Sequence, residues 1–334
     1  MCCGLAGTYP QFVIAYMMVG FGEAGGVAPS YSIISDCFPS RRRGTALGLF
    51  NLGPAIGATL AIAFGAAIAA AFSWSYAFLF LGGIGLLAAI GVLLLVHEPR
   101  RGGLDPIPDT AATIKTGFWQ TFVMFFSRPS PVLAGLGAGA TQFITYGLGN
   151  FLVLFLMREK GMALKQVAVY YALVVLVGVG GSMLVSGRLI DRFSRTSKQA
   201  YALIPAASLA LAIPFYLAFV WASSWHLALL FLVATIFLNY FYLSSTVTLV
   251  QQEVRPDQRV MSGALLLLVM NFIGLGLGPT YVGAASDFFH AAHPDRSLQM
   301  ALYTLVPFYV VAISLFLRLA RVLSRENDTL GVTV

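Results

Sequence analysis

The chain has 334 residues, of which 58% are hydrophobic and only 10% are charged, and its mean hydropathy is +0.83. This composition excludes an ordinary soluble domain and is typical of an integral membrane protein. The net charge of +7 does not indicate nucleic-acid binding, because the Lys and Arg residues form short clusters between apolar runs. Three cysteines without CxxC or Cys/His spacing predict neither a disulfide framework nor a metal site, and no cofactor is expected.

Apolar runs of about 20 residues, the length of a helix that crosses a bilayer, recur along the chain. In chain order we expect nine transmembrane helices, at 11–36, 44–72, 74–96, 131–157, 166–190, 199–221, 225–250, 260–286 and 298–320. When alternate loops are assigned to alternate sides, 16 of the 20 Lys and Arg residues fall on one side. The positive-inside rule makes that side cytoplasmic, with the C-terminus inside and residue 1 outside.

A longer polar connection separates the third predicted helix from the fourth. It contains an aromatic segment, Phe118 to Phe126, with apolar residues at helical spacing, for which we expect an amphipathic helix on the cytoplasmic membrane surface. The expected domains are a partial N-terminal bundle (1–97), this cytoplasmic linker (98–130), a six-helix C-terminal bundle (131–321) and a cytoplasmic tail (322–334).

Two predicted cytoplasmic loops share the pattern acid-x-x-Pro-x-x-Arg. The first is DCFPSRR at 36–42 and the second is EVRPDQR at 253–259. Each precedes a Gly-rich helix that contains an Asn, which is Asn51 in the first case and Asn271 in the second. Such agreement is typical of parallel repeats in a two-halved transporter.

The loop GRLIDRFSR at 187–195 resembles the G-x-L-a-D-R-x-x-R loop of the major facilitator superfamily. Four further segments resemble the spinster-like branch of that superfamily. They are VGFGEAGGVAPSYSIISDCFPSRRRG (19–44), GPAIGATL (53–60), HEPRRG (97–102) and GLGLGPTYVGAASD (274–287). The resemblance covers nearly the whole chain and implies an all-α, two-bundle membrane fold. That family has twelve helices and cytoplasmic termini, so we expect the chain to lack the first three helices. The implied function is proton-coupled secondary transport of a small organic solute, in the bacterial inner membrane.

Glu23 lies near the middle of the first predicted helix, among glycines. A carboxyl group at that depth must face the protein interior or water, and one that exchanges a proton near pH 7 could carry it across. In spinster-like relatives an arginine usually stands seven residues earlier, where this chain has Tyr16. We predict Glu23 and Tyr16 as the proton-coupling site. A permanently protonated Glu23 that only bonds a neighbouring helix is the alternative.

The resemblance also implies a cytoplasmic charge network that closes the inner gate. Asp191 and Arg195 are four residues apart and could pair on a helical turn, and Glu253 could join them. The alternative is that these are ordinary loop charges, each worth less than about 1 kcal/mol. The predicted gate network comprises Asp36, Arg42, Arg188, Asp191, Arg192, Arg195, Glu253 and Arg259.

Polar side chains inside the predicted spans mark the candidate substrate cavity. They are Gln142, Tyr146, Asn150, Asn239, Tyr240, Tyr242, Asn51 and Asn271. Each could instead make a hydrogen bond that only packs two helices together. Aromatic residues beside a few amides suit an amphipathic or largely apolar solute.

Three alternatives to a transporter are an enzyme, a channel and a transport-inactive fragment. An enzyme is not expected, because the four histidines form no HExxH motif and no GxSxG motif is present. A channel would need a filter or a charged ring, and neither is evident. The remaining alternative is a truncated, transport-inactive fragment. The expected partners are a small-molecule substrate, protons and the lipid bilayer, with the chain acting as a monomer.

Overall fold

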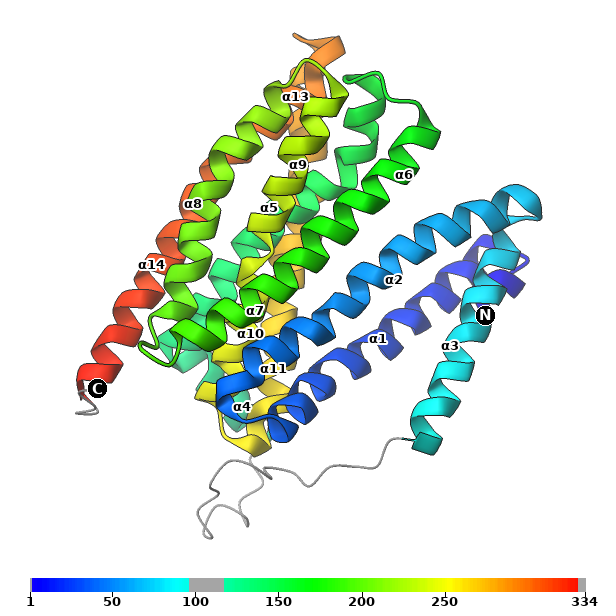
Figure 1. The fold of residues 1–334 in the computed structure, drawn as a ribbon. Helices are drawn as coiled ribbons and strands as arrows, with labels where there is room; N and C mark the ends of the chain where they lie inside the picture. The colour runs from blue at the N-terminus through cyan, green and yellow to red at the C-terminus, as the bar shows by residue number, and fades with distance from the viewer. Residues whose placement is uncertain (1, 96–116, 330–334) are drawn as a thin grey trace.

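The computed structural model describes residues 2–95 and 117–329, and every regular element in these ranges is a helix (Figure 1). The loop motif at 97–102, most of the predicted linker and residues 330–334 of the tail lie outside the described residues. The all-α fold class predicted from the sequence is therefore confirmed for the described part of the chain.

Every predicted span coincides with one helix or with two helices in line. The continuous spans are α1 (Tyr9–Cys37), α2 (Arg43–Ala71), α3 (Trp74–Leu95), α5 (Pro129–Arg158) and α8 (Ala200–Trp221). The divided spans are α6 (Leu164–Val175) with α7 (Gly181–Phe193), α9 (Trp225–Asn239) with α10 (Phe241–Glu253), α11 (Arg259–Asn271) with α12 (Gly278–His290), and α13 (Ser297–Tyr303) with α14 (Val306–Thr329). Eight stretches of the described residues are long and apolar enough to cross a membrane, and they cover every predicted span except α2.

Two of the divided spans are joined by π-helical stretches, Leu176–Gly180 and Phe272–Leu277, which are rich in glycine. Glycine weakens a regular helix and lets a neighbouring helix come close. A Cβ atom at Gly274 would lie 2.6 Å from the Gln142 side chain, and one at Gly178 would lie 2.8 Å from Ile236. The widened turns are therefore places of close helix packing.

The six C-terminal spans form a bundle whose core consists of fully buried large side chains. Leu152, Phe155, Tyr216, Tyr309 and Phe316 are all 0% exposed. The tyrosine hydroxyls in this core have partners, since that of Tyr216 donates to the Leu302 carbonyl at 2.7 Å. Pairing of buried hydroxyls is needed because an unpaired polar group in an apolar core is costly.

The three N-terminal helices lie to one side of that bundle (Figure 1). At one end of the molecule, α1 packs on α11, and α2 packs on α7 and α10. The third helix, α3, packs on α2 and, at the opposite end of α1, on the 3₁₀ turn η1 (Cys2–Leu5). Towards the other end, the N-terminal helices diverge from the bundle (Figure 1). We call the end at which the two groups meet the closed end.

A short helix, α4 (Phe118–Ser127), occupies the predicted amphipathic segment. Phe125 and Thr121 are buried where α4 packs on α5 and α11, whereas Phe118 and Trp119 are 55% and 71% exposed. The aromatic residues are thus shared between the bundle and the outer surface. The position of α4 on a membrane surface stays a prediction.

Candidate functional site

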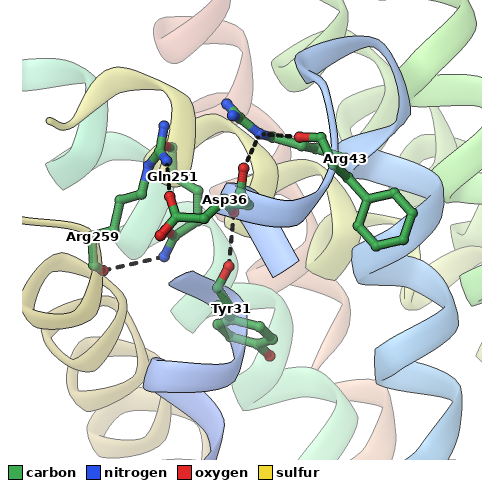
Figure 2. Close-up of polar contacts among 7 residues, drawn as sticks. Tyr31, Asp36, Arg43, Gln251 and Arg259 are labelled. Carbon is green, nitrogen blue, oxygen red and sulfur yellow. Dashed lines mark hydrogen bonds and ion pairs between the residues drawn. The ribbon is translucent and has the colours of Figure 1, made fainter. Parts of the chain in front are cut away.

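A buried ion pair joins the two groups of helices at the closed end (Figure 2). Asp36 lies in the last turn of α1, and Arg259 is the first residue of α11. The Arg259 Nη1 donates to the Asp36 Oδ1 at 2.6 Å, and the two side chains are only 3% and 6% exposed. Removal of either partner would leave an uncompensated buried charge, so this contact fastens α1 to the C-terminal bundle.

The arginine that begins each of the two repeated helices is held in the same way (Figure 2). The Nε atom of Arg259 donates to the carbonyl of Gln251 at 3.1 Å, and the Nε atom of Arg43 donates to the carbonyl of Ser35 at 2.9 Å. In both cases the acceptor lies eight residues before the arginine and a 3₁₀ turn intervenes, η5 (Pro256–Gln258) or η2 (Ser40–Arg42). The sequence repeat is therefore also a structural repeat.

The structural counterpart of Arg259 is Arg43, although the sequence pattern pairs Arg259 with Arg42. Arg43 is 2% exposed, as is Arg259, whereas Arg42 is exposed. The first loop is one residue longer after its proline, so counting from Pro39 selects the wrong arginine of three in a row. Ser35 and Gln251 each lie two residues before the end of their helix, so counting eight residues forward from that position identifies Arg43 and Arg259.

A second contact between the two groups is made by Asp191, near the end of α7. Its carboxylate accepts hydrogen bonds from the backbone N–H groups of Gly44 and Thr45, each at 2.8 Å, and from the Thr45 hydroxyl. Gly44 and Thr45 lie in the first turn of α2, where free N–H groups and the helix dipole favour an anion. The Asp191 carboxylate therefore caps a helix of the other group.

This cap replaces the ion pair expected between Asp191 and Arg195. Within the described residues, no ion pair joins these side chains, because the first turn of α2 takes both carboxylate oxygens. Glu253 does not join them either, and its carboxylate lies 3.4 Å from the Lys198 Nζ. Arg42, Arg188, Arg192 and Arg195 line a cavity beside Asp191.

Glycines allow the close approach of α2 to α7 that this cap requires. A Cβ atom at Gly187 would lie 2.6 Å from the Gly44 carbonyl oxygen, and one at Gly48 would lie 2.5 Å from the Met183 carbonyl oxygen. Contacts of that length are prohibited, so the backbones meet only because these positions lack side chains. Gly44 and Gly48, which are four residues apart as in a GxxxG motif, thus allow α2 to pack closely on α7 of the C-terminal bundle.

The predicted cavity residues form pairs rather than one cluster. Asn51 accepts from the Tyr31 hydroxyl at 2.9 Å, Gln142 donates to Asn271 at 3.1 Å, Asn239 donates to the Tyr309 hydroxyl at 2.8 Å, and Asn150 donates to the Tyr146 carbonyl at 2.9 Å. The rings of Tyr240 and Tyr242 lie close together, with a distance of 6.4 Å between their centroids.

These pairs leave some polar atoms of the predicted cavity residues without a partner. Asn239 bonds to α14, inside the C-terminal bundle, which agrees with the packing alternative. Asn51, Gln142 and Asn239 nevertheless each keep one buried polar atom with no hydrogen-bond partner among the described residues. Such atoms are costly unless something binds them, so all three amides retain the potential to bind a ligand.

The structure places the two predicted proton-coupling residues on α1. Glu23 is the central residue of this 29-residue helix, about 21 Å from either end at 1.5 Å per residue, and its side chain lies outside the described part of the structure. Tyr16 is 60% exposed and its ring stacks on Phe12 at a centroid distance of 6.0 Å.

Charged side chains at the opposite end of the C-terminal bundle are also organised. The Lys160 Nζ donates to the carbonyls of Val220 and Ala222 at 3.0 and 2.6 Å, and the Glu159 carboxylate accepts from the Gln299 amide at 3.1 Å. Partial burial raises the pKa of Glu159 and lowers the pKa of Lys160. These contacts tie the ends of α5, α8 and α13 within one bundle, so they do not join the two halves.

Comparison with known proteins identifies the family. Residues 1–279, which include both inter-half contacts, match the family model described as Major Facilitator Superfamily. This chain belongs to the Major Facilitator Superfamily. Its relatives and solved neighbours place it in the spinster-like branch, as the sequence motifs predicted. Its family and fold are those of transporters rather than enzymes.

Similar proteins include an MFS-type efflux pump from Mycolicibacterium smegmatis, which is 29% identical over 89% of this chain and 67% of the relative. Protein spinster homolog 1 of Xenopus tropicalis is 25% identical over 95% of this chain and 64% of the relative. Among solved structures, a bacterial homologue of the human lysosomal transporter spinster, in an inward-facing and unoccupied conformation, is 26% identical with a TM-score of 0.71. The match covers 97% of this chain and 80% of that structure. The chain thus spans about two thirds of the length of these curated relatives.

Proposed function

We propose that this superfamily member is a proton-coupled secondary transporter that moves a small organic, amphipathic or apolar solute by alternating access. The observation that supports it best is the pair of contacts at the closed end, Asp36–Arg259 and Asp191 with the first turn of α2. Both contacts join the N-terminal helices to the C-terminal bundle, and neither lies inside one bundle. A gate that opens and closes must be built from such contacts.

Opening of the closed end would require both contacts to break together. The ion pair is buried, so its separation exposes two charges that then need water. The Asp191 cap differs from the ion pair. When it breaks, the first turn of α2 loses its anion, and the Asp191 carboxylate becomes free to bind a nearby arginine. The arginine clusters at this end support the proposal that it faces the cytoplasm of a bacterial inner membrane, with the C-terminus on the same side.

Proton coupling is proposed for Glu23, because a midplane carboxyl group is expensive in a membrane and marks function by default. The experiment is proton-driven solute flux into vesicles that contain the purified chain or its Glu23→Gln variant. We expect Glu23→Gln to abolish the dependence on a pH gradient. Glu159→Gln, at the outer end of α5, is the matched control and should keep that dependence. A Glu23→Gln variant with unchanged coupling would refute the assignment.

The substrate would bind between the halves, near Gln142, Tyr146 and Asn271. Tyr240, between α9 and α10, and Tyr242, at the start of α10, would also lie near it. The unpartnered buried oxygen of Gln142 and nitrogen of Asn51 support this placement. A series of apolar and amphipathic dyes in the same vesicles would test the solute class. If only charged sugars or phosphates compete for flux, the proposed solute class is wrong.

The alternative function, a fragment that moves nothing alone, is tested in the same assay. The chain covers 64% of the Xenopus tropicalis relative and 67% of the Mycolicibacterium smegmatis relative. Flux no greater than that of protein-free vesicles, from a chain that remains folded, would favour this alternative. Flux above that level would support autonomous transport by this chain.

A further inference from the structure

A cavity of about 830 Å³ lies at the closed end, between the two halves. Its polar wall combines arginines from both sides. Arg41 and Arg42 come from the loop before α2, and Arg188, Arg192 and Arg195 come from α7 and the turn that follows it. Five cations with a single carboxylate, that of Asp191, make this cavity strongly positive.

The Asp191 carboxylate bonds to the first turn of α2 and interacts electrostatically with Arg195, but its single negative charge offsets only one of the five positive charges. Within the described residues, none of the five guanidinium groups has a carboxylate within 4.0 Å, and all five side chains are exposed. Like charges from two elements therefore surround one space, and among the residues that the structure describes only the Asp191 carboxylate lines it to offset them. Such an arrangement favours an anion that can accept several forked N–H donors, as a phosphate does.

The rest of the cavity wall is apolar. Ile34 and Phe38 contribute from α1 and its end, and Leu49 contributes from α2. Phe38 is 43% exposed and Leu49 is 53% exposed, so both present hydrocarbon to whatever occupies the cavity or passes its mouth. A free inorganic anion would gain nothing from these side chains. A molecule with an anionic head and an apolar tail would contact both walls.

We propose that this cavity binds the phosphate head group of an anionic membrane lipid, with its acyl chains along Ile34, Phe38 and Leu49. The phosphate contacts arginines of both halves, so the bound lipid links the loop before α2 to the end of α7. It therefore stabilises the closed end alongside the Asp36–Arg259 pair. The lipid site goes beyond the proposed transport function, since binding can be measured whether or not the chain transports.

The test is native mass spectrometry of the purified chain with phosphatidylglycerol, and with phosphatidylcholine that carries the same acyl chains. We expect phosphatidylglycerol to bind more tightly, and Arg42→Gln/Arg192→Gln to weaken its binding about 30-fold, since each arginine contributes about 1 kcal/mol. The matched control is Arg318→Gln/Arg321→Gln on α14, which removes two exposed arginines at the same end outside the cavity. It should change binding less than about threefold.

Two further results decide between sources of the phosphate. Millimolar inorganic phosphate should compete weakly, because it lacks the apolar tail. Equal binding of phosphatidylglycerol and phosphatidylcholine, or an equal loss in both double variants, would overturn the proposal. Full displacement by inorganic phosphate would overturn the choice of a lipid. If the double variant does not fold, the single variants Arg42→Gln and Arg192→Gln replace it, each with an expected loss of about fivefold.

Discussion

Apolar helices occur in both the N-terminal group and the C-terminal bundle, but they are buried to very different degrees. Trp74–Leu95 is the most hydrophobic span of the chain, with a mean hydropathy of 2.6, yet none of its apolar window is buried. Pro129–Arg158 has a mean hydropathy of only 1.4, and 56% of its window is buried. Hydropathy therefore predicts that a helix crosses a membrane, whereas burial depends on the helices available to pack against it.

The two regions also differ in how their helices are held in place. The C-terminal spans are held to one another by a continuous core that includes Leu152, Phe155 and Tyr216. The N-terminal helices add only a few residues to that core, such as Tyr31 and Leu47. Their attachment depends on buried ion pairing, a helix cap and glycine contacts at the closed end. Four comparisons between substitutions test this division, in decreasing order of expected effect.

Arg259→Gln should have the largest effect, a loss of about 4 kcal/mol in the free energy of unfolding, because Asp36 is left buried and unpaired. The control is Arg255→Gln, which breaks an exposed pair with Asp257 and should cost less than about 1 kcal/mol. Denaturant unfolding in detergent micelles would measure both. Equal losses for the two variants would mean that the buried pair does not fasten the N-terminal helices.

Leu152→Ala and Leu94→Ala compare the two regions directly. Leu152 is 0% exposed in the C-terminal core, so its truncation should leave a cavity and cost about 3 kcal/mol. Leu94, on α3, is 76% exposed and should cost less than about 0.5 kcal/mol. Thermal unfolding of both variants would give the difference. A comparable loss from Leu94→Ala would show that α3 is packed against something in the membrane.

Gly187→Ala should cost about 2 kcal/mol, since its Cβ atom would press on the Gly44 carbonyl oxygen at 2.6 Å and displace α2. Gly57→Ala is the matched control on α2, where a Cβ atom meets nothing within 4 Å. We expect Gly57→Ala to be neutral or slightly stabilising. Unfolding midpoints would separate the two, and an undisturbed Gly187→Ala would argue against tight contact between the halves.

Tyr309→Phe and Tyr31→Phe should have the smallest effects, about 1 kcal/mol each. Each substitution removes one buried hydrogen bond to an asparagine, Asn239 in the C-terminal bundle or Asn51 in the N-terminal region. Tyr76→Phe, whose side chain is 57% exposed, should have no measurable effect. If Tyr31→Phe behaves like Tyr76→Phe, the hydrogen bond on α1 contributes nothing to holding that helix in place.

The fold was largely predictable because hydropathy is a local property of the sequence. All nine predicted spans coincide with helices, and the helix ends agree within a few residues except at α14, which extends to Thr329. The family was also predictable, since the GRLIDRFSR loop and the spinster-like segments are contiguous stretches. The helix breaks were not predicted, because the π-helical turns at Leu176–Gly180 and Phe272–Leu277 reflect close packing against other helices.

The partners of the site residues could not be predicted from local spacing. Helical periodicity correctly makes Asp191 and Arg195 neighbours, but the Asp191 carboxylate finds the first turn of α2, 147 residues earlier, where unpaired N–H groups are free to donate. Likewise Arg259 pairs with Asp36 across 223 residues. The acidic residue in the second copy of the repeat, Glu253, contacts Lys198 instead.

The sequence by itself determined that the chain is helical and apolar and that it carries a repeated loop, because each of these properties depends on residues that are close together in the chain. Only the tertiary structure decided which arginine of Arg41, Arg42 and Arg43 is buried, and which charges face each other across the closed end. The physical reason is that burial and pairing depend on the distance between helices, which glycines such as Gly44 and Gly187 set through space.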